Sequence, residues 1–302
     1  MEILRYVAFS GDPEGGNPAG VVLDAAGAGE AAMLAAAAEV GYSETAFVTE
    51  ARDGSLAVRY FSPLAEVPFC GHATIATAVA HAERHGPGRL VLDTAAGQVP
   101  VTTDRAADGG LVATLVSVAP RTAPLAQPDL DALLSLLGWS AGDLDPQLPP
   151  RVAYAGAWHP VIAAARRERL ARLDYDMAAL AGLMARRDWT TIDLVHRESP
   201  TLFHARNPFP PGGVVEDPAT GAAAAAFGGY LRELGLVAPP ATLTIRQGED
   251  MGRPSTITVS VPPGPREGIA VTGTAVRIRG GVTGPGAPPA GHRLTGAATA
   301  GR

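Results

Sequence analysis

The chain has very little cysteine and little positive charge. Cys70 is the single cysteine in 302 residues, so no intrachain disulfide can form. A protein without disulfides is expected in a reducing compartment, and the sequence therefore predicts a cytoplasmic location. Lys and Arg total 24 against 30 Asp and Glu, which gives a net charge of −6. Nucleic acids and anionic membranes need clustered positive charge, so neither is an expected partner.

Several other signals are missing. No apolar stretch approaches the roughly 18 residues of a membrane span, and the N-terminus does not have the pattern of a signal peptide. A Gly-rich dinucleotide fingerprint or phosphate loop is absent, so no nucleotide cofactor is expected. His81 and His85 have the i, i+4 spacing of metal ligands on a helix, but the sequence places no third ligand beside them. The sequence therefore predicts neither a cofactor nor a metal site.

The chain does contain an internal repeat, since residues 66–78 and 214–224 are similar. When His72-Ala73-Thr74 is set over Pro218-Ala219-Thr220, Gly71 falls on Asp217. Both stretches lead from a loop into an Ala-rich, helix-prone run. The repeat predicts a duplicated domain with one helix N-terminus in each half. Two such N-termini that point into one cleft would suit a small carboxylate.

The periodicity of the two halves agrees with this duplication. Short alternating strands, joined by turns too tight for crossovers, predict antiparallel or mixed sheets. We expect a first half at residues 1–118, a crossover with a short helix at 119–150, and a second half at 151–283. The remaining segment, 284–302, is rich in Gly, Pro and Ala and is predicted to be disordered. The expected helices are 30–40, 74–83, 129–137, 176–184 and 219–234.

Five segments, in this order and at this spacing, resemble the PhzF family of phenazine biosynthesis-like isomerases. They are 16–22 (GNPAGVV), 41–48 (GYSETAFV), 59–63 with 66–74 (RYFSP and EVPFCGHAT), 216–221 (EDPATG) and 246–255 (RQGEDMGRPS). The resemblance covers about residues 3–280. It implies an α+β fold of the diaminopimelate epimerase type, with two pseudo-symmetric domains that each wrap an antiparallel, barrel-like sheet around a central helix. It also implies an active site between the halves, proton transfer without a cofactor, and a homodimer.

Glu44 is the predicted general acid/base. Epimerase relatives use two facing cysteines, which a chain with one cysteine cannot supply. The PhzF branch uses a glutamate that matches Glu44. A carboxyl group in a closed, partly apolar cleft has a raised pKa and can both take up and return a proton. The spacing of Glu44 alone favours a surface glutamate at a strand edge.

The resemblance also marks His72 and Asp217 as catalytic. His72 would contact substrate or relay a proton, and Asp217 would hold a substrate amino or hydroxyl group. Each has a purely structural alternative. His72 could be a capping or buried histidine, and Asp217 could be an ordinary N-cap followed by proline at the first helical position.

The remaining site candidates are expected to bind substrate. Gly71 and Gly221 would let the backbone approach a carboxylate. Asn17 and Ser43 are polar residues expected in the cleft, although each could serve only in a turn. Ala222 stands where some family members have a serine, so a hydroxyl group that could bind substrate is missing. Cys70 is interpreted as a small buried hydrophobic residue.

These features lead to three hypotheses. The first is an isomerase that shifts a proton and a double bond on a small, carboxylate-bearing, cyclic or unsaturated amino or hydroxy acid, in a biosynthetic pathway of secondary metabolism. The second is a lyase or hydrolase that uses Glu44 as a base. The third is a non-catalytic family member that binds a small ligand, which the absence of a serine at Ala222 mildly favours.

Overall fold

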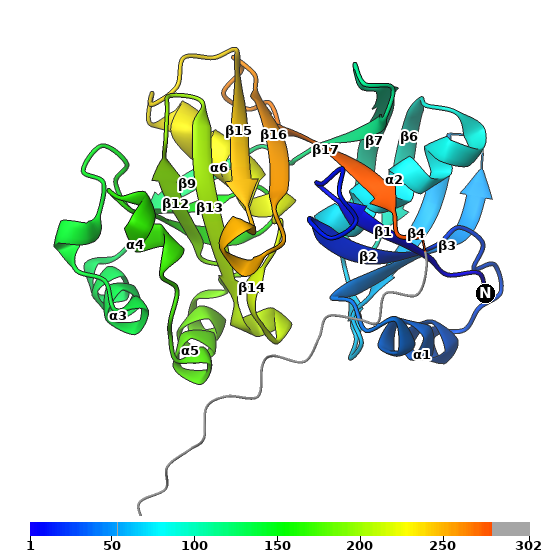
Figure 1. Ribbon diagram of the computed structural model, residues 1–302, viewed down its shortest axis with the longest axis horizontal. Coiled ribbons are helices and arrows are strands. Elements are labelled where there is room, and N and C mark those ends of the chain that lie inside the picture. The colour runs from blue at the N-terminus through cyan, green and yellow to red at the C-terminus, as the bar shows by residue number, and fades with distance from the viewer. Residues whose placement is uncertain (53, 280–302) are drawn as a thin grey trace, which may run out of the picture.

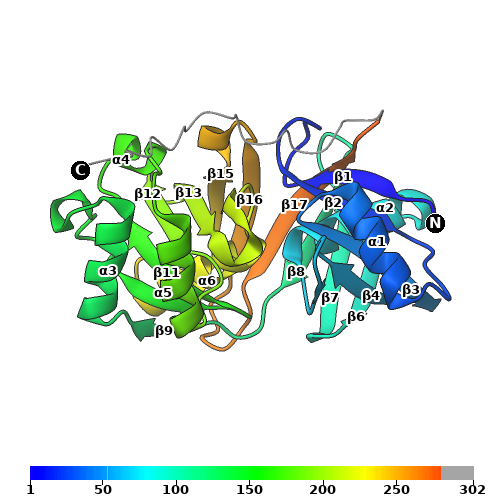
Figure 2. The same cartoon turned by 90° about the horizontal axis from the view of Figure 1, so that it is seen from below.

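The computed structural model describes residues 1–52 and 54–279 and shows two lobes side by side (Figures 1 and 2). Asp53, in the predicted turn at 53–54, and the predicted disordered segment 284–302 lie outside the described residues. The first lobe contains β1 (Leu4–Ala8), β2 (Asn17–Val22), α1 (Glu30–Val40), β3 (Glu44–Arg52), β4 (Ser55–Phe61), β5 (Glu66–Val67), α2 (Gly71–His85), β6 (Arg89–Thr94), β7 (Gly97–Arg105) and β8 (Leu111–Val116).

The second lobe follows with a similar order of elements. It contains β9 (Arg121–Pro124), α3 (Gln127–Leu137), the 3-10 helix η1 (Ala141–Asp143), β10 (Arg151–Tyr154), β11 (Trp158–Ala163), α4 (Arg167–Ala171), α5 (Met177–Arg187), β12 (Asp193–Arg197), β13 (Leu202–Phe209), η2 (Pro210–Gly212), β14 (Val214–Asp217), α6 (Gly221–Glu233), β15 (Ala241–Gln247), η3 (Glu249–Met251), β16 (Ser255–Val261) and β17 (Ala270–Arg277).

In the first lobe, strands close into a barrel around α2. The pairing runs from β1 through β2, β3, β4, β6, β7, β8 and β17 and returns to β1. The β2–β3 and β4–β6 pairs are parallel and the others are antiparallel, so the predicted mixed sheet is confirmed. Helix α2 is the core of this barrel. Its alanines and its valine and isoleucine are buried around the whole helix, which is the pattern of a core helix rather than of an amphipathic surface helix.

The second lobe repeats this connectivity around α6. Its β11–β12 and β13–β15 pairs are parallel, as their counterparts in the first lobe are. Helix α6 is buried from Ala223 to Leu231 and contacts β9, β10, β11, β16 and β17. The same order of parallel and antiparallel pairs therefore occurs twice, each time with a central Ala-rich helix. The α+β fold of two pseudo-symmetric halves is confirmed.

Strand β17 joins the two sheets. Its first residues pair with β16 of the second lobe, and residues 275–277 pair with β1 of the first lobe. In Figure 1 it crosses from one lobe to the other. The predicted boundaries at 118 and 151 remain predictions. Strand β17 lies in the predicted second half but pairs with β1 and β8 and so completes the barrel of the first lobe.

Local sequence signals account for several helix boundaries. Helix α1 spans the predicted residues and ends at Gly41, which has a φ of 71°. Helix α5 begins after Asp176, whose carboxylate accepts a hydrogen bond from the Ala179 backbone N–H. Short elements were not expected from the sequence, namely β5, β9, β14, α4 and the 3-10 helices. Among the described helices, none is long and apolar enough to cross a membrane.

Candidate active site

Glu44 and His72 lie together where their elements begin. Glu44 is the first residue of β3, and His72 is the second residue of α2. Glu44 Oε2 is 3.5 Å from His72 Nε2, and the two side chains are only 14% and 6% exposed. Ser43 Oγ lies 3.4 Å from the same nitrogen. The structure therefore brings three of the predicted site residues to one edge of the first barrel.

Asp217 ends β14 and sits beside the start of α6. Its Oδ2 accepts a hydrogen bond of 2.6 Å from Thr220 Oγ1, and its Oδ1 accepts one of 2.7 Å from Asn17 Nδ2. Burial raises the pKa of this carboxyl group to about 6, although His72 and the hydrogen bond from Thr220 oppose the shift. The alternative of Asp217 as the helix N-cap is wrong, because the N-cap residue of α6 is Thr220.

Asn17 connects the two lobes. Its Nδ2 contacts Asp217 Oδ1, the Ala219 carbonyl oxygen at 3.1 Å and His72 Nδ1 at 3.2 Å. The side chain is 1% exposed, and its Oδ1 has no hydrogen-bond donor among the described residues. Contacts through Asn17 and His72 thus join Ser43 and Glu44 of the first lobe to Asp217 of the second.

Gln247 is a site residue that the sequence reasoning missed. Its Nε2 donates to the Asp217 carbonyl oxygen at 2.7 Å and to Thr220 Oγ1 at 3.0 Å. Its Oε1 accepts from the Thr220 backbone N–H at 3.1 Å. The side chain is 1% exposed and holds the turn between β14 and α6. The available signal was its position in the segment 246–255, which carried part of the family resemblance.

The first turns of α2 and α6 are free of side-chain caps. Neither N-cap residue, Cys70 or Thr220, makes a side-chain hydrogen bond to the helix backbone. A Cβ atom added at Gly71 would meet nothing within 4 Å, and one at Gly221 would make ordinary contacts with Phe9 and Val271. Ala222, the next residue of α6, is half-buried. Both helix starts therefore leave backbone N–H groups that can donate hydrogen bonds to an anion.

Cys70 packs against the imidazole of His72. Its Sγ is 3.3 Å from Nδ1 and 3.8 Å from Nε2. Burial, with a smaller effect of the Glu44 charge, raises the pKa of the thiol well above its ordinary value. Ligand atoms of Glu44, Cys70 and His72 lie within 4.8 Å of one another, a spacing that a metal ion could bridge. A cysteine that binds a metal does so as the thiolate, so an ion here would have to displace the thiol proton.

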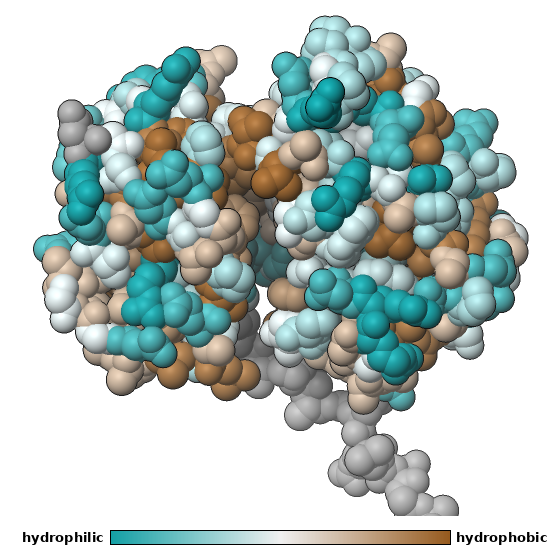
Figure 3. Space-filling model, turned by 180° about the vertical axis from the view of Figure 1, so that it is seen from behind, coloured by the Kyte–Doolittle hydropathy of each residue, from teal (hydrophilic) through white to brown (hydrophobic). Residues whose placement is uncertain are grey.

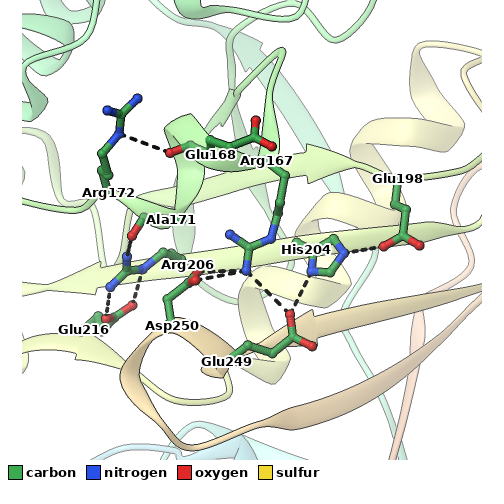
Figure 4. A network of polar contacts seen from close by, with 10 residues as sticks. All are labelled: Arg167, Glu168, Ala171, Arg172, Glu198, His204, Arg206, Glu216, Glu249 and Asp250. Carbon is green, nitrogen blue, oxygen red and sulfur yellow. Dashed lines mark hydrogen bonds and ion pairs between the residues drawn. The ribbon is translucent and has the colours of Figure 1, made fainter.

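A network of charged residues lies beside Asp217 and just after Gln247 in the sequence (Figure 4). Arg206 of β13 donates to both carboxylate oxygens of Glu216, the residue before Asp217, and to the Ala171 carbonyl oxygen at the end of α4. His204 lies between Glu198 at 2.5 Å and Glu249 at 2.8 Å. Arg167 of α4 reaches Asp250 at 3.0 Å. These contacts tie β13, β14, α4 and η3 together.

The surface cavities do not identify the site by themselves. The space-filling view shows a cleft between the lobes (Figure 3). A cavity of about 440 Å³ is lined by Phe9, Arg246, Ser255 and threonines of β16 and β17, and it includes none of the predicted catalytic residues. The threonines alternate along β17 with buried Val271 and Gly273. This cavity therefore lies on the outer face of β17, opposite α6.

Comparisons with known proteins agree with this arrangement. The family model for phenazine biosynthesis-like proteins matches residues 6–281. The chain is 31% identical to the uncharacterized isomerase YfhB of Bacillus subtilis (91% of this chain and 96% of that protein). It is 32% identical to the trans-2,3-dihydro-3-hydroxyanthranilate isomerase of Pseudomonas fluorescens (91% and 94%). A Bacillus anthracis PhzF-family structure superposes with a TM-score of 0.83 at 27% identity (92% and 98%). The chain therefore belongs to the PhzC-PhzF family of phenazine biosynthesis-like proteins, a family of isomerases.

Proposed function

We propose that the protein moves a proton between two carbons of a small carboxylate-bearing substrate, with Glu44 as the general acid/base. The substrate class is a cyclic or unsaturated amino or hydroxy acid. The observation that carries the proposal is the junction of the lobes, where Glu44 lies 3.5 Å from His72 and Asn17 links His72 to Asp217. The relative from Pseudomonas fluorescens, named for a dihydro-hydroxyanthranilate, supports the substrate class.

The step needs no group other than these side chains. The Glu44 carboxylate removes a proton from an allylic carbon, so a C–H bond breaks and a carboxyl O–H bond forms. The electron pair shifts the double bond by one position. Glu44 then returns the proton to the far end of the allylic system, which forms a new C–H bond and restores the carboxylate. The partly buried position of Glu44 favours this role, because few water molecules compete with the substrate for its carboxylate.

His72 and Asp217 would assist from the two sides of the cleft. Asp217, held by Asn17 and Thr220, would accept a hydrogen bond from a substrate amino or hydroxyl group. Asn17 Oδ1, which is buried and has no donor among the residues that the structure describes, would serve as a second acceptor for such a group. The uncapped N-termini of α2 and α6 would hold the substrate carboxylate through backbone N–H groups, including those at Gly71 and Gly221.

The rival readings have less support. Residues 138–142 (GWSAG) match the nucleophile pattern of some hydrolases, but Ser140 Oγ donates to Asp143 at 2.9 Å and caps η1. This serine is thus occupied by a structural role. A lyase that uses Glu44 as its base, and a member that only binds ligand, differ from the proposal in their products and are separated by the experiment below. The homodimer expected from the resemblance remains a prediction.

The test is proton NMR of candidate dihydroaromatic and unsaturated cyclic amino acids in deuterated buffer. Wild-type protein should give deuterium incorporation or double-bond migration, and Glu44→Gln should give neither. Loss of a substituent would instead indicate a lyase. If wild-type protein binds an anionic analogue, shown by a thermal shift, but catalyses no exchange in any candidate, the protein is a binding protein and the proposal is wrong.

A further inference from the structure

Asn17 occupies a position that only a hydrogen-bond donor can fill. Its amide group faces the Asp217 carboxylate at 2.7 Å and the Ala219 carbonyl oxygen at 3.1 Å. A carbonyl oxygen can only accept, and Asp217 already accepts from Thr220 at its other oxygen. The opposite amide orientation would place Oδ1 against two acceptors. The orientation with Nδ2 toward the second lobe is therefore fixed by chemistry, and the same Nδ2 is what faces His72.

This orientation decides which nitrogen of His72 carries the proton. Nδ1 of His72 lies 3.2 Å from Asn17 Nδ2 and 3.3 Å from the protonated thiol of Cys70. The amide nitrogen can only donate, with its two hydrogens shared among Asp217, Ala219 and Nδ1, whereas a thiol can donate or accept. A lone pair on Nδ1 is therefore the state that suits both neighbours. In the neutral ring, the hydrogen then resides on Nε2. That nitrogen faces Ser43 Oγ at 3.4 Å and Glu44 Oε2 at 3.5 Å, both of which accept.

Residues 15 and 16, which precede Asn17, form hydrogen bonds with the second lobe. Arg253, which follows η3, donates to the Gly15 and Gly16 carbonyl oxygens at 2.6 and 2.8 Å. The Gly16 backbone N–H donates to the Pro254 carbonyl oxygen at 3.0 Å. The second lobe therefore helps to fix residues 15 and 16, directly before Asn17, while the pairing of Asn17 with Ala8 holds it in β2.

We propose that Asn17 is a positioning residue that fixes His72 in the tautomer with its hydrogen on Nε2, directed toward Glu44. Through this contact the second lobe sets the direction in which His72 donates in the first. A catalytic base oriented by a third group is a recurrent arrangement, and the wrong tautomer can abolish its function even in an intact geometry. Only the effect on rate rests on the proposed function; the tautomer itself does not.

The tautomer is measurable by nitrogen NMR of histidine-labelled protein, with the His72 signals assigned from their loss in His72→Gln. In wild-type protein, we expect an unprotonated Nδ1 and a protonated Nε2. Asn17→Asp places a carboxyl group 2.7 Å from Asp217, so the two share a proton at low pH. At a pH where both are ionised, an acceptor faces Nδ1 and the hydrogen should move to that nitrogen. Asn17→Leu, which removes the donor at similar size, should give both tautomers.

The kinetic counterpart separates positioning from binding. Asn17→Asp keeps an oxygen at the place of Oδ1, so KM should change by less than about threefold while kcat falls about 10²-fold, the usual contribution of one oriented proton-transfer group. A wild-type spectrum with the hydrogen on Nδ1, or an unchanged tautomer in folded Asn17→Asp, would overturn the inference. The wild-type spectrum alone can overturn the inference, so the test remains valid even if a variant fails to fold. The expected tautomer in a protein without turnover would refute only the proposed function.

Discussion

Asn17 Nδ2 lies 2.7 Å from Asp217 Oδ1, although the two residues are 200 positions apart and belong to different lobes. The contact is buried on both sides. A buried hydrogen bond to a charged group contributes on the order of 1.5–3 kcal/mol, and an unpaired partner would cost more. The bond therefore contributes to the alignment of the lobes as well as to the site. Both functions depend on the duplicated fold, which brings one helix N-terminus from each half to the same place.

Glu44→Gln should abolish proton transfer. The amide retains the shape of the side chain but cannot accept and return a proton, so we expect a fall of about 10³-fold or more in kcat. The measurement is deuterium incorporation at saturating substrate. The matched control is Glu50→Gln on the same strand, where the side chain is 55% exposed and paired with Arg52. Equal losses in both variants would point to damage of β3 and contradict a specific role for Glu44.

Asp217 should produce the acidic limb of the pH profile. Burial raises its pKa to about 6, so the carboxylate that accepts from Asn17 and Thr220 is lost as the pH falls below 6. We expect kcat/KM to fall about tenfold per pH unit in that range. In Asp217→Asn, the rate should be lower and this limb should disappear. A limb that persists unchanged in the variant would have to belong to another group.

The sequence was a good guide wherever one signal is strong and local. The α1 span follows from its alanines and from Gly41, which takes the left-handed conformation at the helix end. The predicted site residues His72 and Asp217 lie in motifs beside glycine and proline, whereas Glu44 was singled out only by the family resemblance. Element β14 did not stand out, because its four residues contain two exposed valines and two acidic residues that become buried only through Arg206 and the turn before α6.

The long-range polar contacts could not be predicted from the sequence. His159, Thr191, Asn207 and Asp193 form a buried chain of hydrogen bonds, yet nothing in the sequence pairs them with one another. The interruption of the apolar run 192–195 by an aspartate was the one available hint. The other members, His159 of β11 and Asn207 of β13, reach Thr191 and Asp193 only in the folded sheet.

This buried chain makes stability depend on pH. Burial raises the pKa of Asp193 from 3.8 to about 7, so the folded state holds a proton that the unfolded state releases. The free energy of unfolding should therefore decrease as the pH rises from about 4 to about 7. Asp193→Asn removes this contribution, so its stability relative to wild type should increase over that range, by a few kcal/mol in total.

Urea unfolding at pH 5 and pH 8 tests this prediction, with Asp174→Asn as the control at an exposed carboxylate. His159 acts in the opposite sense. Burial lowers its pKa to about 4, so its contribution to stability is lost as the pH falls below 6.5. A parallel pH dependence of wild type and Asp193→Asn would show that Asp193 is ionised in the folded state.

Cys70 should resist alkylation in the folded protein. Its thiol is buried and its pKa lies well above the ordinary value, so little of the reactive thiolate is present at pH 8. Iodoacetamide should modify the protein quickly only after denaturation. Intact-mass measurement reads out one site without ambiguity, because the chain has one cysteine. Rapid modification of the native protein would mean that the thiol is exposed and activated, and the interpretation of Cys70 as a small buried hydrophobic residue would be wrong.

Gly16→Ala should damage the site from a position that touches no proposed reacting group. Gly16 has a φ of 55°, and a Cβ atom there would lie 2.3 Å from Val7 Cγ1 and 2.4 Å from the Ala8 carbonyl oxygen.

The backbone must therefore shift, and the adjacent Asn17 must move with it. We expect a loss of stability on the order of 1–3 kcal/mol, together with a fall in kcat. Gly11→Ala is the control in the same loop, because an added Cβ atom there meets nothing within 4 Å. Thermal unfolding and the deuterium-exchange rate should separate the two variants. If Gly16→Ala were as active and as stable as Gly11→Ala, the loop would not hold Asn17 against His72 and Asp217 in the way that the hydrogen bonds from Arg253 indicate.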